Sequence, residues 1–340
     1  MSELTPDRII QTGLGFWASK SLLSAVELGL FTTLADKAMT GEELNAALGL
    51  HARANPDFFD TLLALGFLER DGEGPSARYR NTQETAAFLD RSKASYVGGI
   101  LEMANARLYR FWGDLTEALK TGKPQNEMKN GGKSMFGELY ADPARLEQFI
   151  EAMTGVSTAN FMALAEKFDF SRYNTLCDVG GAAGVLSIMV ASRHKHIACI
   201  SADLPEVSPI AQRKIARFGL TDRVQTKDID FFADPLPKAD VITMGMILHD
   251  WNLDNKMMLI RKAYAALPEG GAFIAVESLI DDARRQNAFG LMMSLNMLIE
   301  FGEAFDFTGA DFTRWCKAAG FKRTEIIPLA GPASAAVAYK

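Results

Sequence analysis

The 340-residue sequence contains few cysteines and no long apolar segment. Its three cysteines, Cys177, Cys199 and Cys316, lie far apart and show no CxxC or Cys/His ligand spacing. This pattern argues against a disulfide framework or a structural zinc site and favours buried thiols in a reducing compartment. No run of about 18 apolar residues is present to cross a bilayer, and the N-terminus lacks the charged-then-apolar order of a signal peptide. We therefore expect a cytoplasmic protein without a membrane partner.

The sequence also lacks an excess of basic residues. Its 36 Lys and Arg residues against 42 Asp and Glu residues give a formal net charge of -6. A protein of this charge has no general attraction for polyanions, so a nucleic-acid partner is not expected. The length instead suits two domains, and the hydrophobic content of 48% supplies enough apolar side chains for their cores.

The first hundred residues are expected to form short helices and a hairpin. Apolar positions predict a helix over residues 6–34, and the capping box Thr40–Glu43 begins a second, short helix. A third helix is predicted over residues 57–65, followed by a hairpin within residues 67–81. This layout resembles a winged helix, but 9 basic against 13 acidic residues disfavour binding to DNA phosphates. Residues 1–100 are therefore predicted to be a winged-helix-like packing or dimerisation domain.

The rest of the chain changes from long helices to alternating strands and helices. Helices over about residues 99–121 and 142–168 make residues 101–170 a connecting segment. The strands that follow are predicted at residues 175–179, 197–202, 223–227, 239–244, 272–277, 323–328 and 335–339, and the helices at 185–193, 207–218, 254–267 and 311–319. This alternation predicts an α/β fold, a Rossmann-like doubly wound sheet over residues 171–340 with helices on both faces.

A turn of small residues follows the first of these strands. Asp-Val-Gly-Gly-Ala-Ala-Gly at residues 178–184 joins a strand to a helix, which indicates a nucleotide-type site at the carboxyl edge of the sheet. An NAD-linked oxidoreductase would need Gly-x-Gly-x-x-Gly, but the register that uses Gly181 and Gly184 has Val179 at its first position. The turn therefore favours a different nucleotide-like cofactor.

Two carboxylates near this turn favour S-adenosylmethionine. Asp178 stands at the mouth of the turn, where a carboxylate would repel a pyrophosphate but would suit the ammonium of a methionyl group. Asp203, at the end of the second strand, is placed to accept hydrogen bonds from both ribose hydroxyls.

Three segments in a fixed order carry a resemblance to a known family. They are the turn at residues 178–184, Ala-Asp-Leu-Pro-Glu-Val at 202–207 and Ile-Leu-His-Asp-Trp at 247–251. The sequence resembles, over nearly its whole length, the O-methyltransferases that include the caffeic acid and hydroxyindole enzymes and many bacterial antibiotic-tailoring enzymes. The resemblance implies S-adenosylmethionine as cofactor, S-adenosylhomocysteine as product, no metal, and a homodimer formed through the N-terminal domain.

The resemblance also implies roles for individual residues. His249 matches the catalytic base, and Glu277 and Asp306 match two acids that flank it, with Glu277 holding the imidazole tautomer. The residues matched to cofactor binding are Asp178, Gly180, Gly181, Gly184, Asp203, Leu204, Asp230, Phe231 and Met244. Those matched to the substrate pocket are Met103, Phe149, Met153, Met246, Asp250, Met292 and Asn296. The sequence departs from the family pattern at Ala182 and Ile229, where glycine is usual, and at Asp306, where glutamate is usual.

The predicted reaction is methyl transfer to a hydroxyl of an aromatic or polyketide-like small molecule. A histidine that removes the hydroxyl proton contributes about 10²–10⁴-fold to such a rate, and abundant Met and aromatic residues predict a flat, apolar acceptor. The alternatives are an N- or C-methyltransferase, or a homologue that uses the bound cofactor structurally for another reaction. An NAD-linked oxidoreductase and a DNA-binding regulator are the more distant hypotheses.

Overall fold

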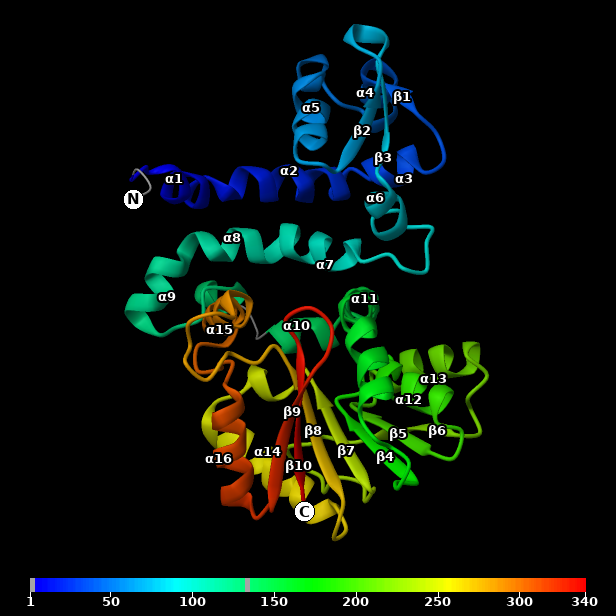
Figure 1. Cartoon of the computed structure of the whole chain (residues 1–340), viewed down its shortest axis with the longest axis vertical. Helices are drawn as coiled ribbons and strands as arrows, with labels where there is room; N and C mark the ends of the chain where they lie inside the picture. The colour runs from blue at the N-terminus through cyan, green and yellow to red at the C-terminus, as the bar shows by residue number, and fades with distance from the viewer. Residues whose placement is uncertain (1–3, 132–134) are drawn as a thin grey trace. The chain divides into compact units, whose positions relative to one another are not determined.

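The computed structural model describes residues 4–131 and 135–340. The chain divides into two units, Met1–Arg110 and Phe111–Lys340 (Figure 1). The division falls later than the boundary predicted at residue 100, so the segment predicted to connect two domains is shared between the units. Within the described ranges, no helix combines the length and the apolar character that a membrane span requires.

The first unit contains the short helices and the hairpin that the sequence predicts. Its α-helices are α1 (Asp7–Gly13), α2 (Gly15–Glu27), α3 (Leu30–Leu34), α4 (Gly41–Leu48), α5 (Asp57–Ala64), α6 (Gln83–Phe88) and α7 (Gly98–Met103). Its strands, β1 (Met39–Thr40), β2 (Leu68–Asp71) and β3 (Arg78–Asn81), form an antiparallel sheet in the order β1-β3-β2. The predicted capping box is present, because the Thr40 side chain accepts from the Glu43 N–H and the Glu43 side chain accepts from the Thr40 N–H.

The single helix predicted over residues 6–34 is wrong in detail. The chain forms three helices there, because the backbone leaves helical geometry at Leu14 and adopts a left-handed conformation at Gly29, with φ of 72°. The helix predicted over residues 99–121 is also interrupted, by a π-helical turn at Ala104–Leu108 and a 3-10 turn at Trp112–Asp114. Apolar periodicity alone does not reveal such interruptions, since the apolar face continues across them.

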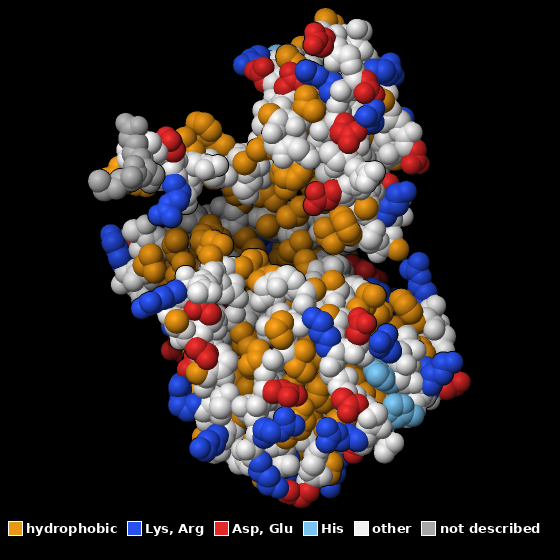
Figure 2. Space-filling view, in the orientation of Figure 1, with side chains coloured by type: hydrophobic (Ala, Val, Ile, Leu, Met, Phe, Trp, Pro, Cys, Tyr) orange, Lys and Arg blue, Asp and Glu red, His pale blue; other side chains and the backbone are white. Residues whose placement is uncertain are grey.

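The first unit has apolar side chains both in its core and on its surface. Leu30, Phe31 and Phe59 are buried in its core with the other apolar side chains of α2 to α5. On the surface, however, Ile9 is 73% exposed and Trp17 is 61% exposed, and hydrophobic side chains gather along α1 and α2 (Figure 2). An exposed apolar stripe of this kind is typical of a surface that contacts another protein.

The second unit is a mostly parallel sheet with helices on both faces. Its strands are β4 (Thr175–Val179), β5 (Ala198–Asp203), β6 (Val224–Asp228), β7 (Val241–Gly245), β8 (Ala272–Glu277), β9 (Arg323–Pro328) and β10 (Ser334–Tyr339). Its longer helices are α9 (Leu115–Thr121), α11 (Pro143–Lys167), α12 (Val185–Arg193), α13 (Ser208–Arg217), α14 (Leu253–Ala266), α15 (Ala288–Phe301) and α16 (Gly309–Ala319), and α10 (Met135–Tyr140) is short. Most of these bounds agree with the prediction to within one or two residues.

The order of the strands creates a ligand site at one edge of the sheet. The order is β6-β5-β4-β7-β8-β10-β9, and only β10 runs antiparallel to its neighbours. The chain proceeds from β4 outward to β5 and β6 and then returns to place β7 on the other side of β4. In such sheets ligands bind beyond the carboxyl ends of the strands at this reversal, so the turns after β4 and β7 are the expected site.

Two apolar layers hold this edge in place. One layer packs α14 and α16 on the sheet through residues such as Leu259, Phe273 and Phe312. The other packs α11, α12 and α13 on the opposite face through residues such as Leu164 and Ile188. Figure 1 shows the two sets of helices on opposite faces of the sheet. With both faces covered, the central strands β4, β7 and β8 are mostly buried and the polar residues that follow them are held on a rigid frame.

Candidate active site

The turns after β4 and β7 contact one another through a glycine. Gly180 has φ of +70°, and a Cβ there would lie 2.3 Å from Ile247 Cδ1. A Cβ on Gly181 would lie 2.3 Å from the Ser201 Oγ and 3.2 Å from the Asp178 carbonyl oxygen. Gly184 then begins α12 in a left-handed conformation. A side chain at Gly180 or Gly181 would therefore clash with its neighbours. The two glycines leave this space open and let the turns after β4 and β7 approach each other at one edge of the sheet.

Ala182 keeps the shape of the turn although it is not a glycine. It adopts a left-handed conformation with φ of 48°, and its N–H donates to the Asp203 Oδ2 at 2.8 Å. The hydrogen bond helps to hold a conformation that a residue with a side chain rarely adopts. At the second departure from the family pattern, Ile229 is buried and its N–H donates to the Asp203 carbonyl.

Asp203 is a carboxylate fixed by backbone donors. Its Oδ2 accepts from Ala182, as above, and its Oδ1 accepts from the Leu204 N–H at 2.8 Å. Burial raises the pKa of Asp203 to about 6, although these backbone hydrogen bonds lower it. Each carboxylate oxygen has lone pairs beyond the one already used. The group can therefore accept hydrogen bonds from a ligand with two adjacent hydroxyls.

Asp178 is more deeply buried than the sequence suggests. Its side chain is 3% exposed, and its Oδ1 accepts from the Thr243 hydroxyl on β7 at 2.8 Å. Its Oδ2 lies 3.2 Å from the space that a Cβ on Gly181 would occupy. Burial raises the pKa of Asp178 to about 7. A buried carboxylate directed at the turn suits a cationic group, as expected for the methionyl ammonium of S-adenosylmethionine.

The loop after β6 contains Asp230 and Phe231, two of the residues predicted to bind the cofactor. Asp230 Oδ1 accepts from the Phe232 N–H at 2.8 Å, which folds the loop on itself. The Phe231 and Phe232 rings stand edge-on to Trp251, with ring centroids 6.2 and 4.5 Å away. No sequence motif points to Lys262, whose Nζ donates to the carbonyls of Phe231, Phe232 and Asp234 at 2.7 to 2.8 Å. One side chain of α14 thus binds three backbone carbonyls of this loop.

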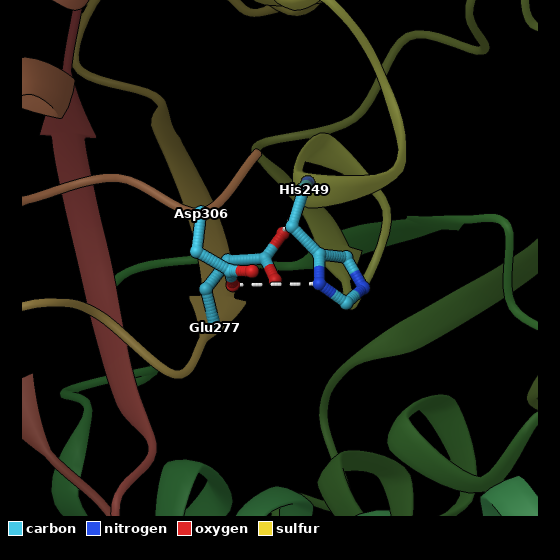
Figure 3. A group of neighbouring side chains, drawn as sticks. All are labelled: His249, Glu277 and Asp306. Carbon is cyan, nitrogen blue, oxygen red and sulfur yellow. Dashed lines mark hydrogen bonds and ion pairs between the residues drawn. The ribbon is translucent and has the colours of Figure 1, made fainter. Parts of the chain in front are cut away.

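His249 lies beside the carboxylates of Glu277 and Asp306 in a buried cluster (Figure 3). It is part of the 3-10 turn Leu248–Asp250 that follows β7, and it is 5% exposed. Its Nδ1 is 3.4 Å from Asp306 Oδ1, and its Nε2 is 3.3 Å from Asp250 Oδ1. The Asp250 side chain is 14% exposed, more than those of His249 and Asp306. The Nε2 side of the imidazole is therefore the side that a substrate can approach.

Glu277 and Asp306 contact different parts of the His249 turn. The resemblance implies that Glu277 holds the imidazole tautomer, but its Oε1 accepts from the backbone N–H groups of Leu248 and His249 at 3.0 and 3.4 Å. Asp306 instead faces the Nδ1 of the imidazole. Glu277, at the end of β8, therefore fixes the backbone of the turn, and Asp306 is the acid that can orient the ring.

The charges around His249 change its basicity. Burial alone lowers the pKa of His249, but the carboxylates of Asp250, Glu277 and Asp306 outweigh it and raise the pKa to about 10. Burial also raises the pKa of Glu277 to about 7 and that of Asp250 to about 6, against the opposing effect of His249. These groups share protons as one system. His249 is therefore a strong proton acceptor once its imidazole has lost its own proton. A higher pH or a nearby positive charge favours that loss.

The residues predicted to form the substrate pocket lie on several elements of the chain. Met246 follows β7 in a left-handed conformation, and Met292 is 50% exposed on α15. Asn296, also on α15, accepts from the Trp112 Nε1 at 2.9 Å. Met153 is half-buried on α11. Met103 ends α7 and belongs to the first unit.

Three other predicted residues lie beside the cofactor turn or inside the core. Phe149 and Leu204 pack against the same apolar cluster as Ala182 of the glycine turn. Met244 is 0% exposed within the sheet core. Its side chain has no surface left for a ligand, because β7 is central and covered on both faces.

Comparisons with known proteins agree with this geometry. Residues 112–322 match the O-methyltransferase domain, and residues 10–91 match the O-methyltransferase dimerisation domain. The chain is 40% identical over 335 residues to the tetracenomycin polyketide synthesis 8-O-methyl transferase TcmO of Streptomyces glaucescens, covering 98% of this chain and 97% of TcmO. It is 33% identical over 314 residues to the N,N-dimethyltransferase OxyT of Streptomyces rimosus, covering 92% of this chain and 90% of OxyT.

A solved structure resembles the whole chain. Human N-acetylserotonin methyltransferase in complex with S-adenosylmethionine superposes with a TM-score of 0.91 at 28% identity, covering 100% of this chain and 99% of that one. The glycine turn and the carboxylates of Asp178 and Asp203 fit that cofactor, since they leave a cradle free of side chains beside one buried and one partly buried acceptor. The chain therefore belongs to the O-methyltransferase family and is an S-adenosylmethionine-dependent methyltransferase with a dimerisation domain.

Proposed function

We propose that the chain methylates a hydroxyl of an aromatic or polyketide-like small molecule, with His249 as the general base. The observation that carries the proposal is the orientation of His249, whose Nδ1 faces Asp306 while its Nε2 lies on the more exposed side of the cluster. An aligned acceptor and an available base are what such a transfer needs from the protein.

The residues of the site divide the work between binding and proton transfer. S-Adenosylmethionine, when bound, supplies an activated methyl group on a sulfonium. Asp203 would accept from its ribose, Asp178 would face its ammonium, and the loop that carries Asp230 and Phe231 would contact its adenine. His249 Nε2 receives the proton that leaves the acceptor hydroxyl, and Asp306 stabilises the resulting imidazolium through Nδ1.

The class of acceptor is inferred from the relatives and from the apolar residues near the site. TcmO is named for a polyketide pathway, and another relative, 34% identical and from Streptomyces sahachiroi, is named as a naphthoate 3-O-methyltransferase. In this chain, Met246, Met292 and Trp112 supply apolar surface near α15 and the turn after β7. A flat, apolar, hydroxylated ring system suits such surroundings.

The first unit supports the proposal of a homodimer. The exposed apolar residues of α1 and α2, such as Ile9, Phe16 and Trp17, belong largely to the region that matches the dimerisation domain. Light scattering should give twice the monomer mass, and Trp17→Glu should lower the measured mass toward that of the monomer.

A cytoplasmic location is also part of the proposal, because Cys177, Cys199 and Cys316 are free and buried.

Labelled S-adenosylmethionine and a panel of acceptors test the proposed reaction. Phenols, catechols, indoles and polyketide aglycones should include at least one that gains label on oxygen. His249→Ala should lose at least about 10²-fold in kcat, while binding of S-adenosylhomocysteine stays within twofold. The matched control is His51→Ala, which removes an exposed histidine of the first unit and should leave kcat unchanged.

Methylation of nitrogen is the second candidate, because OxyT is named as an N,N-dimethyltransferase. A neutral amine already has a lone pair for the methyl group and needs no base before it reacts. His249→Ala should then leave kcat for an amine acceptor nearly unchanged. Label found on nitrogen alone, with turnover that survives this substitution, would replace the hydroxyl proposal.

A further inference from the structure

Lys256 is a buried cation that the proposed reaction does not yet use. It lies on α14 and is 0% exposed, and among the described residues no other Lys or Arg falls in the buried class. Removing an ammonium group from water is costly unless nearby groups compensate for it. A lysine in this position therefore needs partners, and those partners show what it does.

The partners of Lys256 belong to the two segments that carry His249 and Asp306. Its Nζ donates to the carbonyl of Trp251, the residue that ends the His249 turn. It also lies 3.8 Å from the centroid of the Phe305 ring, and Phe305 directly precedes Asp306. A hydrogen bond to the first segment and a cation–π contact with the second connect them through a single atom.

Lys256 also interacts electrostatically with the carboxylates near His249. Burial lowers the pKa of Lys256 to about 8, and the carboxylates of Glu277, Asp306 and Asp250 oppose this effect. The same three carboxylates act on His249. A positive charge near the three carboxylates reduces their mutual repulsion.

We propose that Lys256 is a positioning residue, which sets the spacing of His249 and Asp306 by binding the Trp251 carbonyl and the Phe305 ring face. The proposal rests on the proposed function of His249 as the base. Lys256 itself touches neither acceptor nor cofactor, and it acts only through the two segments that it joins. Its loss should therefore lower the rate of transfer without weakening the binding of the cofactor.

Lys256→Met tests the proposal, because methionine keeps an unbranched apolar side chain and removes the ammonium. We expect kcat to fall at least tenfold, while the Kd of S-adenosylhomocysteine and the acceptor KM stay within twofold. Arg261→Met is the matched control, since it removes an exposed cation from the same helix, and it should leave all three values unchanged. A kcat for folded Lys256→Met within twofold of the parent would overturn the proposal.

A double-mutant cycle separates positioning from a general loss of structure. If Lys256 acts through Asp306, the variant with both Lys256→Met and Asp306→Asn should be no slower than the slower single variant. Effects that multiply fully would overturn the proposal. If Lys256→Met does not fold, Phe305→Leu removes the ring and leaves the ammonium in place, and a kcat within twofold of the parent would then count against it.

One measurement needs no turnover and so distinguishes this proposal from the proposed function. The imidazole NMR signals of His249, assigned with His249→Ala, should shift in Lys256→Met and stay in place in Arg261→Met. Unchanged signals in Lys256→Met would refute the positioning role even if the parent methylates hydroxyls. Shifted signals in a protein that methylates no hydroxyl would support the positioning role and refute only the assigned reaction.

Discussion

Asp203→Asn is the most direct test of the cofactor site, because the substitution keeps the shape of the side chain. Both carboxylate oxygens of Asp203 accept backbone N–H groups at 2.8 Å, from Ala182 and from Leu204. Asparagine has only one oxygen, so its NH₂ group must face one of these donors. The variant therefore loses a hydrogen bond and places two donors together at the turn.

The magnitude follows from the number of hydrogen bonds that change. A hydrogen bond to a charged group contributes about 1.5–3 kcal/mol, so the lost backbone bond should destabilise the folded protein by about that amount. Two ribose hydroxyls would also lose a charged acceptor. A total loss of about 3 kcal/mol in binding corresponds to roughly 10²-fold in the Kd of S-adenosylhomocysteine.

The pH dependence of binding adds an independent check on Asp203. Ribose hydroxyls donate to the ionised carboxylate, and burial raises the pKa of Asp203 to about 6. The parent should therefore bind S-adenosylhomocysteine more weakly as the pH falls from 8 to 5.5. Asp178, with a pKa that burial raises to about 7, titrates in the same interval and should cause the pH dependence that remains in Asp203→Asn.

Calorimetry at pH 5.5 and pH 8 measures both effects. Asp222→Asn, at an exposed position in the loop before β6, serves as the control and should bind like the parent at both values. If Asp203→Asn binds S-adenosylhomocysteine within threefold of the parent at pH 8, the carboxylate does not hold the cofactor and the reasoning fails.

Three further predictions concern the glycine turn, the loop after β6 and the base. Gly180→Ala places a Cβ 2.3 Å from Ile247 Cδ1 at φ of +70°, so it should destabilise by about 1–3 kcal/mol and weaken cofactor binding. A urea midpoint equal to that of the parent would contradict this. Lys262→Met frees three carbonyls of residues 231–234, and the Kd of S-adenosylhomocysteine should rise about tenfold, or about 1.4 kcal/mol, by calorimetry. Because carboxylates raise the pKa of His249 against burial, the acceptor kcat/KM should increase with pH to well above 6.5, and Asp306→Asn should lower that midpoint. A parent midpoint at or below 6.5 would be inconsistent with the cluster.

The fold of the second unit could be predicted because its signals are local. The central strands are short apolar runs, and α14 and α16 end next to Pro268 and Gly320, so these elements have clear sequence signals. β4, α12 and β8 begin and end at the predicted residues. In the first unit, Gly29 interrupts an apolar pattern that is typical of one helix. The π-helical turn at Ala104–Leu108 leaves no mark in the sequence, because the same residue types would continue an α-helix.

The candidate site could be predicted only as far as sequence motifs reach. Gly180, Asp203 and His249 follow strands whose carboxyl ends share an edge, so their proximity follows from the strand order. The tasks of Glu277 and Asp306 depend on which side of the imidazole each carboxylate faces. No spacing in the sequence contains that information, and the structure places Asp306, rather than Glu277, on the Nδ1 side of the imidazole.

The basicity of His249 depends on the balance between burial, which lowers its pKa, and carboxylates from segments far apart in the sequence, which raise it. Carboxylates that raise its pKa make it a stronger proton acceptor, but each unit of increase also lowers the unprotonated fraction at neutral pH about tenfold. The rate is greatest when the gain in basicity balances the loss of unprotonated His249. Three carboxylates therefore favour catalysis only if a nearby positive charge lowers the pKa of His249 again. Lys256 supplies such a charge from α14, and the sulfonium of the cofactor would supply another when bound. The free protein should therefore hold the proton on His249, and occupation of the cofactor site should favour its release.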